Sequence, residues 1–153
     1  MPPALSKLSP FFTIANGVAL TGTLVQVGVP FCVANFTRAA VDVLYTANVG
    51  GGTGAPIIAV DLSRSPTTVV PTTDADWRPQ LILDGSTFTA GAITAYTERC
   101  KPVSPTGAGT TFSTSWPDII DTSCHFWLRV RMADVDGALP GTVSVYVGAA
   151  EGI

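Results

Sequence analysis

The chain has 153 residues and a net charge of −3, and only 12% of its residues are charged, roughly half the fraction of an ordinary soluble domain. Its hydrophobic content of 46% is sufficient for one folded domain and argues against disorder. Lysine and arginine do not cluster, which argues against nucleic acid as a partner because phosphates require concentrated basic charge. Such scarce charge predicts that other protein chains cover much of the surface.

The N-terminal third divides into an arm and the start of the domain. Three prolines (Pro2, Pro3 and Pro10) predict that residues 1–12 form an extended arm, followed by a single domain over 13–153. No charged residue occurs from Leu8 to Thr37. Gly, Pro, Asn and Thr interrupt this stretch too often for a membrane-spanning helix. The N-terminus lacks the pattern of a signal peptide, which predicts synthesis in a cytosol.

Short β-rich segments separated by turn residues follow along the chain. Asn16 and Gly17 predict a tight hairpin turn between two strands. Apolar and polar residues alternate over 39–49, as in a half-buried strand. Further strands are expected at 55–62, 81–83 and 87–97, and one helical turn at 117–121. No segment has helical periodicity, so the predicted fold is all-β, an antiparallel, jelly-roll-like β-sandwich.

The most regular pattern lies near the C-terminus, where residues 124–132 and 142–147 both alternate. A loop over Asp134–Gly141 would connect them, and we interpret them as a long antiparallel hairpin. Its apolar face is predicted to be nearly inaccessible to solvent. The residues of this face are Phe126, Leu128, Val130, Val143 and Val145.

The other face of the same strand is polar and aromatic. It carries His125, Trp127, Arg129 and Arg131, and Tyr146 could join them from the second strand. One interpretation is a subunit interface, in which Trp, Tyr and Arg are common anchors. A second is an inner face of the second sheet, with arginine stems covering the tryptophan. A third is a sugar-binding platform with the indole ring as its floor.

Residues with catalytic or metal-binding chemistry are few. His125 is the single histidine and no nucleophile is spaced to work with it, so we expect no enzyme and no catalytic residue. Asp134, Asp136 and Gly137 resemble part of a calcium loop, but too few oxygen ligands follow, so we expect a plain turn, no metal and no cofactor.

The three cysteines, Cys32, Cys100 and Cys124, lack metal-ligand spacing and are odd in number. We expect free thiols, with Cys100 exposed between two basic residues and the other two in the core.

Residues 126–148 read FWLRVRMADVDGALPGTVSVYVG. This stretch resembles small virion proteins of tailed bacteriophages, as does the general texture of Thr, Gly, Ala and Val with few lysines. The resemblance implies a β-sandwich structural subunit, most of all a capsid decoration (cement) protein bound to the major capsid protein lattice. A tail or fibre component and a carbohydrate-binding module remain the alternatives.

Assembly is the last expectation. An arm that cannot pack as a helix, followed by an uncharged stretch, predicts that residues 1–12 reach onto a neighbouring chain, with Phe11 and Phe12 as anchors. The working unit is therefore expected to be a homo-oligomer within the virion, with a trimer as the first guess.

Overall fold

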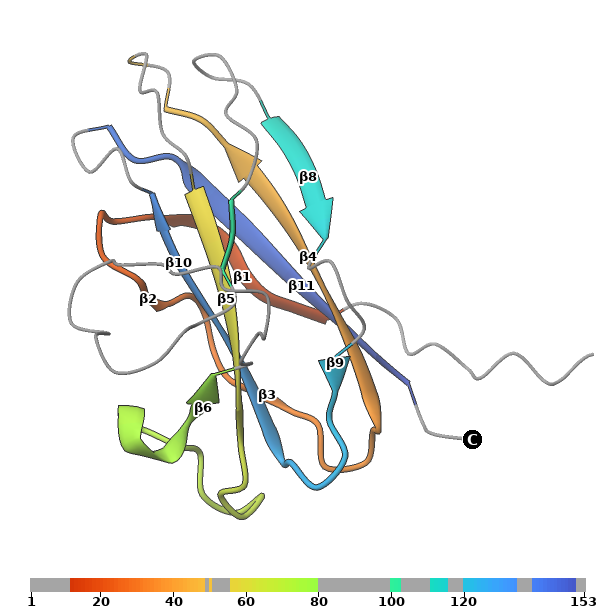
Figure 1. Ribbon diagram of the computed structural model, residues 1–153. Helices are drawn as coiled ribbons and strands as arrows, with labels where there is room; N and C mark the ends of the chain where they lie inside the picture. The colour runs from red at the N-terminus through yellow and green to blue at the C-terminus, as the bar shows by residue number, and fades with distance from the viewer. Residues whose placement is uncertain are drawn as a thin grey trace, which may run out of the picture.

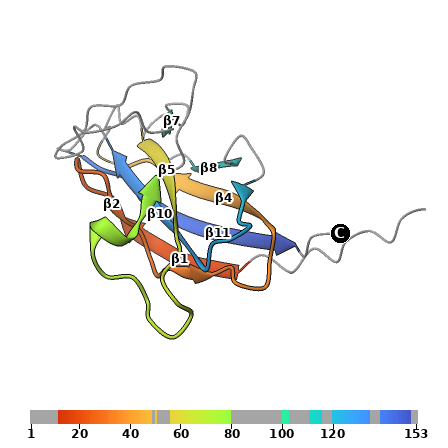
Figure 2. The ribbon, with the colours of Figure 1, turned by 60° about the horizontal axis from the view of Figure 1, so that its bottom comes forward.

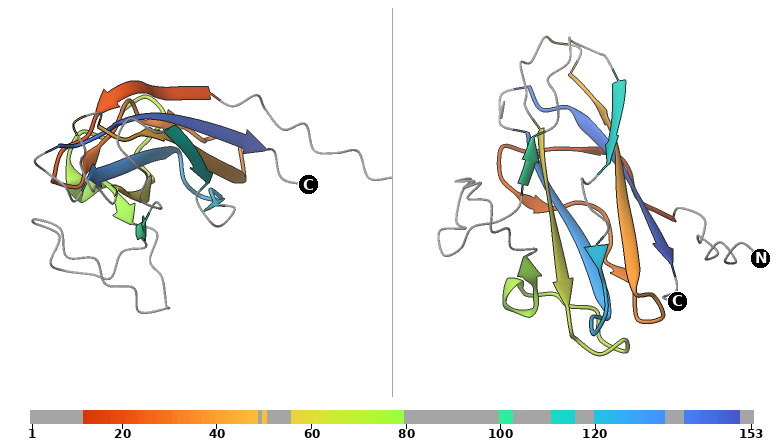
Figure 3. Two further views of the ribbon diagram at one scale, coloured as in Figure 1. Left: turned by 90° about the horizontal axis from the view of Figure 1, so that it is seen from above. Right: turned by 45° about the vertical axis from the view of Figure 1, so that its right-hand side comes forward.

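The computed structural model describes residues 12–48, 50, 56–79, 100–102, 111–115, 120–134 and 139–150. Their strands form two antiparallel sheets that pack face to face (Figure 1), and the left view of Figure 3 shows the two layers from above. Sheet A has the order β1 (Phe12–Ala19), β11 (Thr142–Ala150), β4 (Arg38–Thr46) and β8 (Thr111–Ser115), and β9 (Ile120–Asp121) also pairs with β4. Sheet B has the order β2 (Val25–Gln26), β10 (Trp127–Asp134), β5 (Pro56–Ser63) and β6 (Arg78–Pro79), with β3 (Phe31–Cys32) on β10 and β7 (Cys100–Pro102) on β5.

The pairing of these strands follows a jelly roll. The first strand, β1, pairs with the last strand, β11. The two strands that follow β1 along the chain, β2 and β3, pair with β10, the strand that precedes β11. Further inward, β4 pairs with β8 and β9, and β5 pairs with β6 and β7. The chain is thus a long antiparallel hairpin wound around two sheets, which is the jelly-roll topology. The predicted all-β, antiparallel sandwich is confirmed.

The core lies between the two sheets and is built from alternate residues of the four long central strands. Val41, Val43 and Tyr45 of β4 are buried, as the alternation over 39–49 predicts. The facing layer is formed by apolar side chains of β5 and β10. The fully buried members of that layer are Ile58, Val60, Leu62, Leu128, Val130 and Met132. Figure 2 shows β1, β11 and β4 running alongside one another on the other layer.

The predicted hairpin of 124–132 with 142–147 is wrong. The two segments form β10 and β11, which lie in different sheets, β10 paired with β5 and β11 with β1 and β4. Leu128, Val130, Val143 and Val145 are each at most 1% exposed, as expected, because the two apolar faces meet across the core. A connection of this length can cross between sheets as well as turn within one, so the alternation alone does not separate the two arrangements.

The hairpin turn predicted at Asn16 and Gly17 is also wrong. β1 runs through both residues and stays paired with β11, with register shifts on each side of Ala15. Gly17 adopts a positive φ of 62° and its N–H donates to Ser144 Oγ at 3.0 Å. The positive φ that glycine supplies for a turn is used here for a β-bulge.

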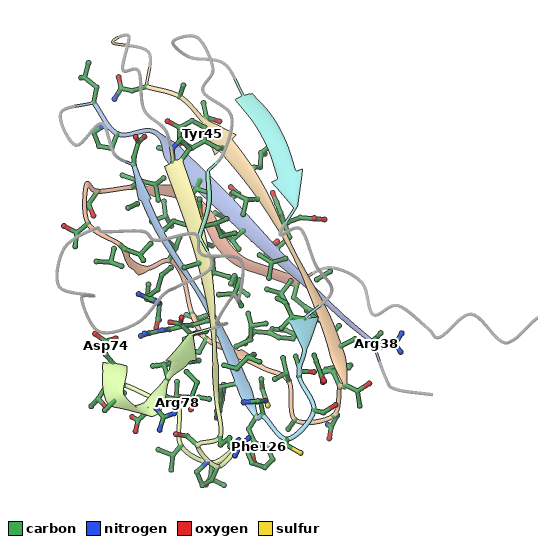
Figure 4. All side chains as sticks on the ribbon, in the orientation of Figure 1. Arg38, Tyr45, Asp74, Arg78 and Phe126 are labelled. Carbon is green, nitrogen blue, oxygen red and sulfur yellow. The ribbon has the colours of Figure 1, made fainter. Side chains whose placement is uncertain are left out.

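Other expectations fail where β10 begins. Phe126 precedes the strand and is 38% exposed rather than buried, and Figure 4 places it at the lower end of β10. Cys32 and Cys124 are free, as expected, but exposed rather than part of the core. The helical turn expected at 117–121 is not formed at Ile120–Asp121, which make up β9.

Several expectations fall on other parts of the chain. Residues 1–11, 81–83 and 87–97 and the side chain of Cys100 lie outside the described residues. Phe12, assigned to the arm, is instead the first residue of β1. In the described part of the chain, no helix has the length and apolar character needed to cross a membrane.

Candidate functional site

The polar row of β10 lies on the outer face of sheet B, where the segment 64–79, which includes the 3₁₀ helix Asp74–Asp76, contacts Trp127 and Arg129. Every residue of β10 is buried on both faces of the strand. Trp127 is 8% exposed, Arg129 7% and Arg131 5%. The apolar core covers one face of β10, and the segment 64–79 contributes to the burial of the other.

Asp61 is the centre of this row. It lies opposite Arg129 in the β5–β10 register and has no exposed surface. Its Oδ2 accepts hydrogen bonds from Arg129 Nε and Arg131 Nε, both at 2.6 Å, and its Oδ1 accepts one from Arg131 Nη2 at 2.8 Å. A carboxylate and two guanidinium groups removed from water stabilise one another only in such close geometry.

Arg129 also connects the sheet to the covering segment. Its Nη1 donates to Asp74 Oδ1 at 2.8 Å, and its guanidinium carbon lies 4.8 Å from the ring centre of the buried Trp77. Figure 4 shows Asp74 and Arg78 on the green segment beside the lower half of sheet B. Trp127 adds a second contact to the covering segment, because its Nε1 donates to the carbonyl of Pro66 at 3.2 Å. The cluster therefore fastens the segment 64–79 to the sheet.

Sequence reasoning identified the arginines and missed their partners. Asp61, Asp74 and Trp77 come from two other parts of the chain, and only Asp61 gives a signal, as the single charge within the apolar strand 56–62. A charge in a strand that is otherwise apolar is a buried charge in need of a partner.

Tyr146 does not join this row. It lies on the outward side of β11 in sheet A, between its register partners Thr13 and Asp42, and is half-buried. Tyr146 thus lies on the outer face of sheet A, on the side of the sandwich opposite Trp127, Arg129 and Arg131. Whether another chain contacts any of them stays a prediction.

Phe12 is 43% exposed at the start of β1, and its ring centre lies 5.3 Å from that of Phe31. Phe36 continues this group of rings, 6.5 Å from Phe31. The other predicted anchor, Phe11, is outside the described residues.

The partial calcium motif contains a structural carboxylate. Asp134 is fully buried, and its Oδ2 accepts hydrogen bonds from Tyr45 Oη at 2.8 Å and from the Gly141 N–H at 2.9 Å. These bonds join the ends of β4, β10 and β11 near the top of Figure 4, where Tyr45 is labelled. Among the residues that the structure describes, no group of three or more His, Cys, Asp or Glu side chains is placed to hold a metal ion.

The turn before β10 holds the single histidine. His125 Nδ1 lies 2.9 Å from the Ser123 carbonyl oxygen, and the Ser123 N–H donates to Asp121 Oδ1 at 2.9 Å. Hydrogen bonds from Ser123 lower the pKa of the Asp121 carboxyl, with smaller contributions from the charges of His125 and Arg38. The side chains of this turn bond to one another and to its backbone, which is the arrangement of a tight turn.

The fold and these contacts define an all-β jelly-roll protein with a covered outer face on one sheet. No family model matches the chain, and no curated protein matches it. A solved structure of infectious bursal disease virus, strain Gx, contains a chain that is similar in fold, with a TM-score of 0.52 and 11% sequence identity. The similarity covers 99% of this chain and 36% of that chain, so this chain spans about a third of its length. At this identity the likeness shows a shared fold.

Proposed function

We propose that this protein is a non-enzymatic structural subunit of a virion. The observation that carries the proposal is the jelly roll itself, which matches a chain from a virus structure over 99% of the present chain. The jelly roll is a common architecture of viral capsid domains. The buried carboxylates of Asp61 and Asp134 make hydrogen bonds that join strands of the fold, which is a structural use of these groups.

Within this role we propose a decoration (cement) protein that binds the outside of the major capsid lattice of a tailed bacteriophage. The resemblance of residues 126–148 to small phage virion proteins supports it. Charge supports the outer location, because an acidic chain of net charge −3 without a basic cluster is unsuited to lining the genome. Its partners would be the major capsid protein and other copies of itself, and it would be made in the host cytoplasm.

Binding to capsids tests this proposal. Purified protein is mixed with capsids that lack it, and the capsids are then pelleted and imaged by cryo-electron microscopy. A cement subunit is expected to saturate regular sites on the outer surface and to raise the temperature at which the capsid opens. Failure to bind the head, combined with binding to purified tails, would replace the cement role by a tail role.

A carbohydrate-binding module is the rival, because lectins also use jelly rolls. The platform considered from the sequence is not available in this structure, since Trp127 is 8% exposed and its indole N–H is bonded to Pro66. A glycan array probed with the isolated protein separates the two functions. Specific glycan binding in the absence of capsid binding would contradict the structural role.

A further inference from the structure

The bulge in β1 contains an asparagine followed by a glycine, Asn16 and Gly17, and both residues are exposed. The side-chain amide of an asparagine can be attacked by the backbone nitrogen of the next residue. Glycine hinders this attack least because it has no side chain. The attack closes a succinimide ring and releases ammonia, and water then opens the ring to aspartate or isoaspartate. The sequence of the bulge is therefore chemically suited to deamidation.

The fold places one hydroxyl group between the two groups that react. Ser144 lies on β11, which runs beside β1 (Figure 2), and it is 127 residues from Gly17 along the chain. The Gly17 N–H donates to Ser144 Oγ at 3.0 Å, and Ser144 Oγ donates to Asn16 Oδ1 at 3.2 Å. A hydroxyl accepts one hydrogen bond while it donates another, so the two bonds coexist. The bulge makes this possible because Asn16 and Gly17 together lie opposite Ser144 in the register.

The two hydrogen bonds follow the path that protons take when the ring closes. The Gly17 nitrogen loses its proton as it bonds to Cγ of Asn16, and Oδ1 gains a proton as the C=O double bond opens. A hydroxyl between them takes the first proton and gives up its own, so it ends unchanged. In the next step the proton on Oδ1 moves to the side-chain nitrogen, which leaves as ammonia while the C=O double bond forms again. Ser144 is thus placed as a proton relay for the first step.

We propose that Asn16 of the folded protein is converted to aspartate and isoaspartate, and that the Ser144 hydroxyl promotes the ring closure. Water is the co-reactant that opens the ring, and the exposed position of Asn16 gives it access. The product places a negative charge in the uncharged sequence from Leu8 to Thr37. Isoaspartate also adds a carbon atom to the backbone of β1 and so disturbs its pairing with β11. The site is a slow chemical modification of the edge of sheet A, and it is independent of the proposed virion role.

Incubation of the folded protein at neutral pH, followed by digestion and mass spectrometry, tests the proposal. The mass of the peptide reports conversion of the Asn16 amide to a carboxyl. Isoaspartate demonstrates passage through the succinimide, since direct hydrolysis gives aspartate alone. Wild-type protein is expected to convert at least about tenfold faster than Ser144→Ala, less than the full effect of a positioned acid–base group because water partly replaces the hydroxyl. Ser144→Thr keeps a hydroxyl and is expected to keep most of the rate.

Two controls separate the role of the fold from that of the local sequence. In urea Ser144 no longer lies beside Gly17, so the wild type and Ser144→Ala are expected to convert at equal rates. Asn35, an exposed asparagine followed by phenylalanine, is the reference in the same digest and is expected to convert more slowly than Asn16. Circular dichroism checks that each variant is folded during the incubation.

The other outcomes overturn the inference. An Asn16 that stays intact in the folded wild type, or that converts equally fast in Ser144→Ala, would show that the hydroxyl is not a relay. Faster conversion in folded Ser144→Ala would show that the two hydrogen bonds protect the amide instead. Equal slowing by Ser144→Ala and Ser144→Thr would assign the effect to packing rather than to the hydroxyl.

Discussion

Asp61→Asn is expected to destabilise the protein by about 3–5 kcal/mol, because it removes the carboxylate that neutralises two buried arginines. The magnitude follows from the geometry. The carboxylate is inaccessible to solvent and accepts three charge-assisted hydrogen bonds of 2.6–2.8 Å from Arg129 and Arg131. Asparagine keeps the shape of the side chain and one acceptor oxygen, but it leaves two cations in a site with little access to water.

Urea denaturation followed by tryptophan fluorescence measures the change, since Trp77 and Trp127 lie beside the cluster. The control is Asp74→Asn, which removes the other carboxylate bonded to Arg129. The Asp74 side chain is 92% exposed, so this change is expected to cost less than about 1 kcal/mol. Equal destabilisation by the two variants, or a loss below about 1 kcal/mol for Asp61→Asn, would refute the argument that burial sets the strength of this cluster.

Three further predictions concern the core, the backbone and the arm. Leu128→Ala is expected to cost about 2–5 kcal/mol in urea unfolding, since Leu128 has no exposed surface; an unchanged midpoint would contradict the assigned face of β10. Gly28→Ala should destabilise far more than Gly17→Ala in thermal melts, because a Cβ at Gly28 would lie 2.0 Å from the Ile14 carbonyl oxygen, whereas at Gly17 it meets nothing within 4 Å. Gly17→Ala carries only the strain of its positive φ, about 1–2 kcal/mol. Equal melting temperatures for the two variants would contradict the close approach of the backbone at Gly28. Deleting residues 2–11 should leave a folded domain that no longer incorporates into particles, as judged by gel analysis of purified particles; full occupancy would show that the arm is dispensable.

The class of fold could be predicted because it depends on a local pattern. Alternation of apolar and polar residues places Val41, Val43 and Tyr45 on one face whatever the strand pairs with. The partners of a strand depend on distant segments, and the same alternation in β10 and β11 suits one sheet or two facing sheets. Likewise, the positive φ that glycine supplies at Gly17 serves a turn or a bulge.

The candidate site was predicted only in part, because it also depends on contacts with distant segments of the chain. The row of Trp127, Arg129 and Arg131 was recognised, and so was an interpretation in which it is internal. Its burial depends on Asp61 from the neighbouring strand and on Trp77 from the covering segment. Neither contact is encoded in the local sequence of β10, so the sequence alone left a subunit interface, an internal face and a sugar-binding platform open.

A cryo-electron microscopy map of the virion that contains this chain tests the central proposal most directly. The structural role predicts density for the jelly roll at regular positions on the outside of the capsid. A complete map of head and tail in which no density fits the two sheets would contradict the proposal that the protein is a virion subunit.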